Sequence, residues 1–374
     1  LSDGPRLQAA EHGRIFGPLP PEANAGDQLY YLAYHTARHP SPWAPVAVGQ
    51  RDVHAFNLKI RLLALQGQLY DADLGNPLLA MLGHFDLAFV LTVLVPLLVV
   101  AVMFNVHSAE VEDGTWPLLR SQPASMARLL ALRCLLRAAV IWLPVLALLL
   151  LATVWLDLPL DGRWWAVAGA SLAYVLTWTG AALAVAGLRR SSDVNLLVLL
   201  GIWVVWTALG PALLNVAAAA RHPLPEALEL TVLQRQGYHG AWDEPLGEVM
   251  DAFYRRYPEW RSYPVPRDRY SNAWYYAMQQ RGDDAAEEAA GRYRRGLVAK
   301  DAWLARLSWL CPPAAFHRVL TRVARTDLPA YLAYLDSVAA YHERLKQHFL
   351  PVIFSDRSVG EVEWSEAPRH EHWD

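Results

Sequence analysis

The sequence predicts an all-α polytopic membrane protein with a mostly helical domain on one side of the membrane. Three observations support this class. Apolar residues make up 54% of the 374 residues and charged residues only 18%. In soluble domains the average apolar share is about 45–50% and the average charged share about 25%. The apolar residues are concentrated in long uncharged runs. Polar flanks with helical periodicity precede and follow these runs.

The apolar runs are each long enough for a helix that crosses about 30 Å of hydrocarbon, which needs roughly 18 residues or more. They extend over Leu87–Phe104, Ala138–Leu156, Trp164–Leu188 and Val194–Ala220. The sequence therefore predicts four transmembrane helices.

The short loops between these helices set the orientation, because basic residues mark the cytoplasmic side. The second loop has only Arg163. The first and third loops hold Arg120, Arg128, Arg133, Arg137, Arg189 and Arg190. We therefore expect these two loops inside the cell and both flanks outside it.

An external N-terminal flank requires an export signal, and no basic segment followed by an apolar region precedes it. Leu1 opens the sequence in place of methionine, and the sequence stops at the polar "HEHWD". We expect one further helix upstream and one downstream, so that the intact protein has about six.

Three regions follow from this pattern. Residues 1–80 form an extracytoplasmic region, residues 81–220 the transmembrane core, and residues 221–374 an extracytoplasmic helical domain. In the last region, residues 250–257, 271–310 and 328–349 have apolar residues at helical spacing. Asp327 or Thr326 is expected to cap the helix that starts near Leu328. An aromatic stretch, residues 257–276, is expected either to bind a ligand or to pack on its own domain.

The third membrane run contains small residues at four-residue spacing, a pattern that lets helices approach closely in lipid. A close helix neighbour is expected along Ala166, Gly169, Ala170, Ala173, Thr177, Gly180, Ala181, Ala184 and Gly187. Three other runs contain prolines, Pro96, Pro144 and Pro211, which kink helices or free backbone carbonyls. No acid or base lies deep inside a run, which argues against a proton-coupled carrier.

The connection after the first run, "EVEDGTWPLLRSQPAS", is more elaborate than a turn requires. Gly114 can end the first helix, Thr115 can cap a short turn that starts near Pro117, and Ser125 can cap the next helix. We call residues 105–137 the elbow. Its predicted functional residues are Glu110, Glu112, Asp113, Gly114, Thr115, Trp116, Leu118, Leu119, Pro123 and Arg128.

Two interpretations of the elbow remain open. An acidic rim around an apolar knob suits a groove on a cytoplasmic partner. Alternatively, the elbow is an interfacial loop whose acids pair only with its own arginines. On the segment that Ser125 caps, Arg128, Arg133 and Arg137 are expected to extend towards lipid headgroups.

The elbow also carries a resemblance. Its acidic helix end, Gly114-Thr115, Leu118-Leu119, Pro123 and basic segment at Arg128 resemble the cytoplasmic coupling element in membrane subunits of type-2 ABC transporters. Two further stretches resemble a bacterial permease subgroup with large extracytoplasmic loops and a domain of unknown function. They are "HPSPWAPVAVGQRDVHAFNLKI" (39–60) and "LCPPAAFHRVLTRVARTDLPAYLAYLDSVAAYHERLKQHFLPVIF" (310–354).

This resemblance implies a six-helix permease subunit that pairs with a second copy or a sibling permease. A separate cytoplasmic ABC ATPase subunit would bind ATP and Mg²⁺ and dock on the elbow. A periplasmic or outer-membrane partner is also implied as an option. The absence of the expected first and last helices puts independent activity of these 374 residues in question.

Other chemistries find no support in the sequence. The chain has no GxxxxGK[ST] phosphate loop and no GxSxG nucleophile elbow, so we expect neither ATPase activity nor another enzymatic activity in this chain. "HERLKQH" and "HEHW" lack a complete set of metal ligands. A net charge of −3 without a basic stripe argues against nucleic acid. Cys134 and Cys311 fall on opposite sides of the membrane, so no disulfide is expected.

Two functions remain. The first is a permease subunit that moves a substrate across or out of the membrane. The second is a membrane-anchored extracytoplasmic binding or assembly module without transport activity. The sequence specifies neither the substrate nor the direction of transport.

Overall fold

The computed structural model describes residues 24–51, 54–70, 85–122, 125–224, 227–263 and 265–370. Within these ranges the chain is mostly helical, and four helical stretches are long and apolar enough to cross a membrane. They are Leu87–Glu112, Met126–Trp155, Gly162–Ala186 and Ser192–Arg221. The four predicted membrane helices are therefore confirmed as membrane-length helices.

Two of these stretches contain a π-helical turn directly before a proline. The first stretch consists of α5 (Leu87–Phe89), η2 (Val90–Leu94), α6 (Val95–Met103) and α7 (Ser108–Glu112). The last consists of α11 (Ser192–Val204), η3 (Val205–Leu209) and α12 (Gly210–Arg221). Pro96 and Pro211 follow these π turns, which fits the expected disturbance of the backbone ladder. The second and third stretches are α9 (Met126–Trp155), with Pro144 inside it, and α10 (Gly162–Ala186).

The backbone carbonyls near the π turns are bonded by side chains from neighbouring elements. The Tyr174 hydroxyl of α10 donates to the carbonyl of Thr92 at 2.7 Å. The Trp203 indole donates to Val93 at 3.0 Å, and the Cys311 thiol donates to Trp206 at 3.1 Å. Pro96 has no N–H to bond the Thr92 carbonyl four residues earlier, so the Tyr174 hydroxyl replaces a missing backbone donor there.

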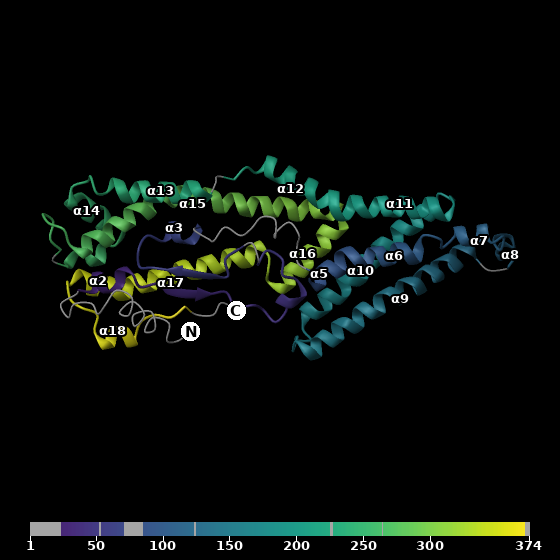
Figure 1. Cartoon of the computed structure of the whole chain (residues 1–374), viewed down its shortest axis with the longest axis horizontal. Coiled ribbons are helices and arrows are strands. Elements are labelled where there is room, and N and C mark those ends of the chain that lie inside the picture. Colours follow the sequence, from purple (N-terminus) through teal and green to yellow (C-terminus); the bar gives the residue numbers. More distant parts are fainter. Residues whose placement is uncertain are drawn as a thin grey trace.

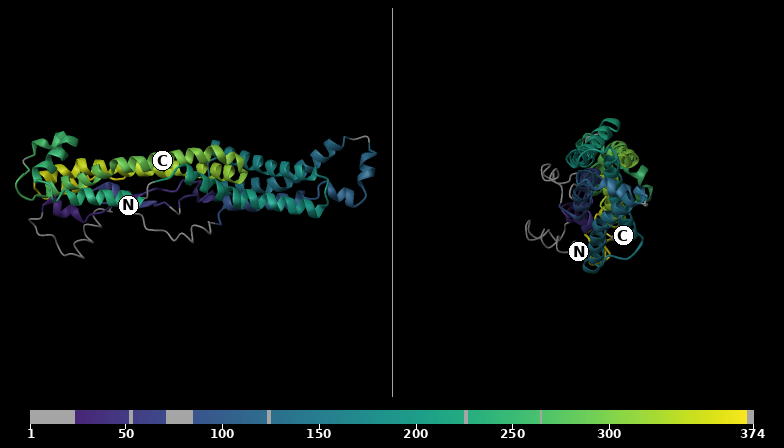
Figure 2. Two further views of the ribbon diagram at one scale, coloured as in Figure 1. Left: turned by 90° about the horizontal axis from the view of Figure 1, so that it is seen from above. Right: turned by 90° about the vertical axis from the view of Figure 1, so that its right-hand side faces the viewer.

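The molecule is elongated, with the membrane-length helices towards one end (Figure 1). α7 and α8 (Trp116–Arg120) lie at the tip of that end, and α14 (Leu246–Arg256) lies at the opposite tip. A view turned by 90° shows the same long, narrow shape (Figure 2). The elbow and α14 are therefore separated by almost the whole length of the molecule, which includes the membrane helices and the flanks.

The two polar flanks fold together into one domain. Its elements are α2 (Ala25–Tyr30), β1 (Tyr34–Ala37), η1 (Ala44–Val46), β2 (Asn57–Ile60), α3 (Leu65–Tyr70), α13 (Ala227–Gly240), α14, η4 (Pro258–Ser262), α15 (Asn272–Leu307), η5 (Ser308–Leu310), α16 (Pro312–Ala324), α17 (Leu328–Phe354) and α18 (Glu361–Ser365). β1 and β2 pair antiparallel with Tyr34 opposite Ile60, which adds a two-stranded ribbon to an otherwise helical fold.

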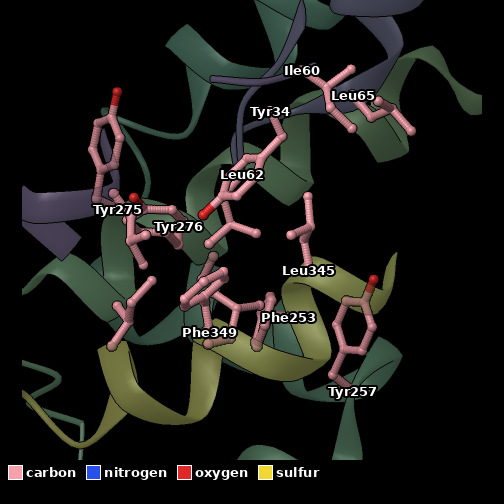
Figure 3. Close-up of a cluster of buried hydrophobic side chains, with 14 of the residues drawn as sticks. Tyr34, Ile60, Leu62, Leu65, Phe253, Tyr257, Tyr275, Tyr276, Leu345 and Phe349 are labelled. Atoms are coloured by element: carbon pink, nitrogen blue, oxygen red, sulfur yellow. The ribbon is translucent and has the colours of Figure 1, made fainter. Parts of the chain in front are cut away.

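The shared core of this domain explains why the flanks associate. Tyr34, Ile60 and Leu62 from the N-terminal flank are buried against Phe253 and Phe349 from the C-terminal flank (Figure 3). Burial of large apolar side chains stabilises by roughly 1.5–3 kcal/mol each. Neither flank therefore has a complete core of its own.

The three predicted flank helices are confirmed as α14, α15 and α17, with small shifts at their ends. Asp327 caps α17 by accepting from the N–H of Ala330, as predicted. In the aromatic stretch 257–276, Trp260 is buried and stacks with Phe253 at 5.5 Å and Tyr257 at 4.7 Å. This part of the stretch therefore packs on its own domain.

Candidate functional site

The elbow is built from α7, α8 and the start of α9. α7 ends at Glu112, and Gly114 follows with a φ of +70°, a left-handed conformation that favours glycine after a helix. Pro117 lies in the first turn of α8, and the Ser125 hydroxyl accepts from the N–H of Arg128 to cap α9. These helix-end predictions are confirmed. Pro123 lies outside the described residues.

Thr115 departs from the prediction in one respect. It occupies the N-cap position of α8, but its hydroxyl makes no cap hydrogen bond. The hydroxyl instead donates to the Glu110 carboxylate and to the Glu110 carbonyl, the latter at 3.2 Å. Thr115 thus closes the bend between α7 and α8, because its side chain turns back to the preceding helix.

Glu110 connects the elbow to α9. Its carboxylate accepts from Arg133 at 2.6 Å, and both side chains are partly buried. Arg137, one turn further along α9, donates to the Val102 carbonyl at 2.8 Å and to Asn105 at 3.3 Å. Arg133 and Arg137 therefore bond to the first membrane stretch, whereas the sequence predicted that they extend towards headgroups.

Glu112 connects the elbow to α11. Its carboxylate accepts from the backbone N–H and from the hydroxyl of Ser192, each at 2.7 Å. Ser191, at the N-cap position of α11, makes no side-chain cap bond, so Glu112 supplies the negative charge that a helix N-terminus favours. Ser108 and Ser192 share a further hydrogen bond of 2.9 Å, beside the buried Asn195.

The outer surface of the elbow combines exposed apolar side chains with an unpaired acid. Leu118 is 69% exposed, and Val111 is also exposed. The Asp113 side chain is exposed and forms no hydrogen bond or ion pair with another described residue, whereas the carboxylates of Glu110 and Glu112 are both bonded. Trp116 packs edge-on against His107 at 4.5 Å. Leu119 is half-buried, and Arg128 is exposed on α9. The surface offered to a partner is therefore Leu118 with Val111 and Asp113.

The small residues of α10 lie on its outward face. The five residues that define this stripe are Gly169, Ala173, Thr177, Gly180 and Ala184, and all are exposed. An added Cβ at Gly169 or Gly180 would meet no atom within 4 Å. No described part of the chain covers this face, so a close neighbour on it would have to come from outside the described residues.

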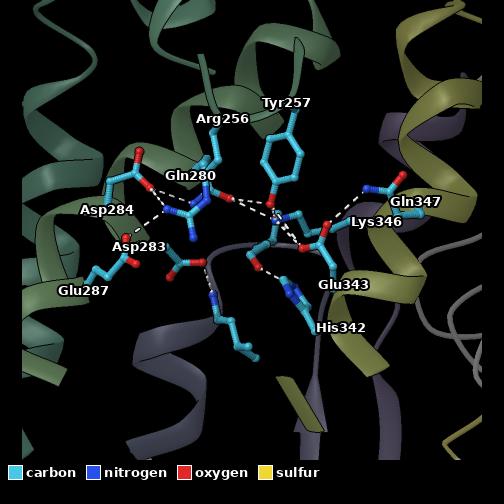
Figure 4. Close-up of polar contacts among 12 residues, drawn as sticks. Arg256, Tyr257, Gln280, Asp283, Asp284, Glu287, His342, Glu343, Lys346 and Gln347 are labelled. Carbon is cyan, nitrogen blue, oxygen red and sulfur yellow. Dashed lines mark hydrogen bonds and ion pairs between the residues drawn. The ribbon is translucent and has the colours of Figure 1, made fainter. Parts of the chain in front are cut away.

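A buried polar cluster in the flank domain was not predicted (Figure 4). Lys346 of α17 donates to Gln280 of α15 at 2.9 Å and to the Tyr257 hydroxyl, and it lies 3.3 Å from the Glu343 carboxylate. Tyr257 in turn donates to Glu343 at 3.1 Å. Burial lowers the pKa of Lys346, an effect opposed by the Glu343 charge.

His342 and Asp283 adjoin this cluster. Asp283 accepts from the N–H groups of Leu65 and Gln66 at 2.8 Å each, which caps α3, and its burial raises its pKa. His342 bonds the Leu63 carbonyl at 2.9 Å, and its burial, together with the nearby Lys346 charge, lowers its pKa to about 4. These bonds fasten the N-terminal flank to α15 and α17.

The cavity beside the cluster measures about 10 Å³, which is room for about one water molecule. This space is too small for a substrate, so the arrangement favours a structural role. The stretch "HERLKQH" contains three side chains of this cluster, His342, Glu343 and Lys346. The one sequence signal for the cluster was a histidine and a lysine at helical spacing on an apolar helix face. His348 bonds the Glu363 carbonyl at 2.8 Å.

Comparison with known proteins gives one match. Residues 228–373 match DUF3526, a domain of unknown function. No curated protein and no solved structure matches the chain.

The DUF3526 region covers α13 to α18, less than half of the chain, and excludes the membrane-length helices and the elbow. This match fits the expected domain of unknown function. It contains Lys346, His342 and Tyr257, but the strands and α3 that complete the domain come from the other flank. The DUF3526 region therefore folds here around a segment from before the membrane helices.

Proposed function

We propose that this chain is the permease subunit of an ATP-driven transporter of the type-2 ABC class, with the elbow as the docking element for a separate ATPase subunit. The observation that carries the proposal is the double attachment of the elbow. Glu110 bonds to Arg133 of α9, and Glu112 bonds to Ser192 of α11. A force applied at α8 would thus reach two membrane-spanning helices.

The surface chemistry of the elbow supports the same function. Val111 of α7 and Leu118 of α8 are exposed, and these two helices lie at one tip of the molecule (Figure 1). A cytoplasmic protein groove would bury this apolar surface, and Asp113 offers one charge for pairing. The ATPase partner would bind ATP and Mg²⁺, since the chain has no phosphate loop of its own.

The exposed stripe on α10 fits a second copy of the chain or a sibling permease. Small residues allow close helix contact in lipid, where packing rather than the hydrophobic effect drives association. The proposed location is the bacterial inner membrane, with the elbow cytoplasmic and both flanks periplasmic. A periplasmic or outer-membrane partner would bind the flank domain.

The second candidate function is a membrane-anchored binding or assembly module. The observation in its favour is the large core shared by both flanks, which forms a domain larger than a simple loop. A module of this kind has no use for a surface attached to two membrane helices. Deletion of residues 115–121 would leave its function intact.

The test of docking targets Leu118, because reversing Glu110 or Glu112 would also break bonds inside the elbow. The chain is co-expressed with a candidate ABC ATPase subunit, and co-purification and ATP hydrolysis are measured. Leu118→Asp places a charge in the proposed contact and should lose both co-purification and coupled hydrolysis. Gln122→Asp, an exposed polar position nearby, is the matched control and should retain both. Equal docking and coupling in the two variants would contradict the proposal.

Topology is tested by thiol labelling in intact cells. Trp116→Cys should react only after the inner membrane is permeabilised. Arg261→Cys, exposed next to the buried Trp260, should react with an impermeant reagent beforehand. Labelling of both positions from one side would overturn the proposed arrangement.

A further inference from the structure

The turn between α15 and α16 lies beside the middle of two membrane-length helices. The thiol of Cys311 donates to the carbonyl of Trp206, and an added Cβ on Gly210 would lie 2.9 Å from that sulfur. The ring of Phe316 stacks on Tyr174 with centroids 4.5 Å apart and planes at 22°. α16 also packs against both π turns, η2 and η3.

The positions of these contact points set the depth of the turn. Tyr174 is the central residue of α10, about three helical turns or roughly 18 Å from Gly162 at 1.5 Å per residue. Trp206 precedes Arg221, the end of α12, by roughly 22 Å of helix. If the hydrocarbon layer of about 30 Å starts near Arg137 of the elbow, it therefore includes both Tyr174 and Trp206.

The first membrane stretch gives the same depth. Asp86 caps α5 and marks the polar boundary on the flank side. Thr92, whose carbonyl accepts from Tyr174, is about 9 Å of helix further in. Since Phe316 stacks on Tyr174, the start of α16 lies below that boundary.

The free surface of the turn is apolar and aromatic. Trp309 is 80% exposed and Leu310 is 73% exposed. In water, two adjacent side chains of this size would be left without apolar contacts. Acyl chains would supply those contacts over their whole surface.

Several donors at the turn are either absent or bonded, which lowers the cost of placing it in lipid, where unbonded backbone donors are costly. Pro312 and Pro313 have no N–H groups at the start of α16. The N–H of Cys311 bonds the Ser308 carbonyl at 2.9 Å, and the Ser308 hydroxyl bonds the Ala305 carbonyl at 2.9 Å.

The charged residues of the hairpin lie away from its tip. Asp301 and Arg318 form a two-bond ion pair, at 2.8 and 3.2 Å, that joins α15 to α16 on the domain side of the turn. Arg306, which directly precedes the turn, is exposed on α15, and a side chain of its length can extend from there to the headgroups.

We propose that residues 307–313 form a re-entrant turn in the flank-side half of the bilayer, where Trp309 and Leu310 contact lipid acyl chains. The segment escapes hydropathy analysis because its apolar part is shorter than a membrane span. The turn thereby anchors the flank domain in the membrane, beside the π turns that precede Pro96 and Pro211. This inference rests on the membrane-spanning helices and does not require the ATPase partner.

The experiment measures lipid contact at single labelled positions in the full chain, reconstituted in phosphatidylcholine nanodiscs. In a Cys134→Ala, Cys311→Ser background, Trp309→Cys and Leu310→Cys carry an environment-sensitive fluorophore. The serine hydroxyl keeps a donor for the Trp206 carbonyl. Quenching by doxyl-labelled phosphatidylcholine and by iodide is compared with two exposed controls, Leu197→Cys on α11 and Val362→Cys on α18.

The expected result is a blue-shifted emission at positions 309 and 310. Doxyl lipid should reduce the fluorescence at these positions as much as at position 197, and iodide should not reduce it. Position 362 should show the opposite pattern. Iodide quenching at 309 and 310 like that at 362 would overturn the proposal. Protection from both quenchers would also overturn it, because it would show that protein covers the turn. If doxyl lipid also failed to quench the fluorophore at position 197, the result would contradict the assignment of α11 as a membrane-spanning helix.

Discussion

Glu112 and Ser192 are joined by two hydrogen bonds of 2.7 Å, from the backbone N–H and the hydroxyl of Ser192 to one carboxylate. The two residues are 80 positions apart in sequence, yet they join α7 to the first turn of α11. The elbow therefore moves with the last membrane helix.

Glu112→Ala should release this attachment. The N–H of Ser192 loses its acceptor, so backbone amides in residues 108–112 and 192–195 should exchange with deuterium faster, as measured by mass spectrometry. Asp113→Ala removes a neighbouring exposed carboxylate that has no partner in the described chain, and its exchange should match the wild type. Equal exchange in both variants would show that the Glu112 bonds do not hold the elbow.

Gly114→Ala should destabilise the elbow through backbone conformation alone. Gly114 has a φ of +70°, and a Cβ there would meet no atom within 4 Å, so no steric clash contributes. The left-handed conformation costs a non-glycine residue roughly 1–2 kcal/mol. Thermal unfolding of the full chain in detergent should show a lower Tm.

Gly162→Ala provides the matched control for this change. Gly162 begins α10 in an ordinary helical conformation and also has open space around it. Alanine favours a helix over glycine by up to about 1 kcal/mol, so the Tm should stay level or rise. A similar loss of Tm in both variants would contradict the conformational explanation for Gly114.

Local features of the fold were predictable from the sequence because they depend on neighbouring residues. Hydropathy gave the four membrane-length helices, and residue type gave the caps at Ser125 and Asp327 and the break at Gly114. Each of these depends on interactions within a few residues. The helix ends of the elbow were predictable for this reason.

The pairing of Glu110 with an arginine of the elbow was one of the two predicted interpretations, and Arg133 is that arginine. The partner of Glu112 was not predictable, because Ser192 lies 80 positions further along the chain and is brought in by tertiary packing. The buried Lys346 likewise depends on Tyr257 and Gln280, which come from other elements. Periodicity shows which face of a helix is apolar, but not which polar groups meet beneath it.

Tyr174→Phe should destabilise the membrane core while leaving the ring stack on Phe316 in place. The lost hydroxyl leaves the Thr92 carbonyl without its donor, and Pro96 cannot supply one because it lacks an N–H. A hydrogen bond in this environment contributes about 1 kcal/mol. Thermal unfolding in detergent measures the change.

A double-mutant cycle with Pro96→Ala separates this explanation from a packing effect. Alanine at position 96 has an N–H one turn after the Thr92 carbonyl, so the loss on Tyr174→Phe should shrink in that background. An equal loss in both backgrounds would show that the hydroxyl acts in some other way.

His342 should make the stability of the flank domain depend on pH. Its pKa is about 4 in the folded protein and near 6.5 when unfolded, because burial opposes its charge. As the pH falls below 6.5, the unfolded chain takes up a proton that the folded chain does not. Stability should therefore fall between about pH 6.5 and pH 4, by up to roughly 3 kcal/mol. Asp283, whose pKa is raised, acts in the opposite direction near the acidic end of this range.

His342→Gln isolates the histidine contribution, since its amide can donate to the Leu63 carbonyl without titrating. The difference in Tm between the wild type and His342→Gln, measured from pH 7.5 down to pH 4, cancels the Asp283 contribution common to both. The wild type should lose Tm more steeply below about pH 6.5, the unperturbed histidine value. Parallel pH profiles would mean that His342 titrates alike in the folded and unfolded chains, and the buried bond to Leu63 could not then hold it neutral.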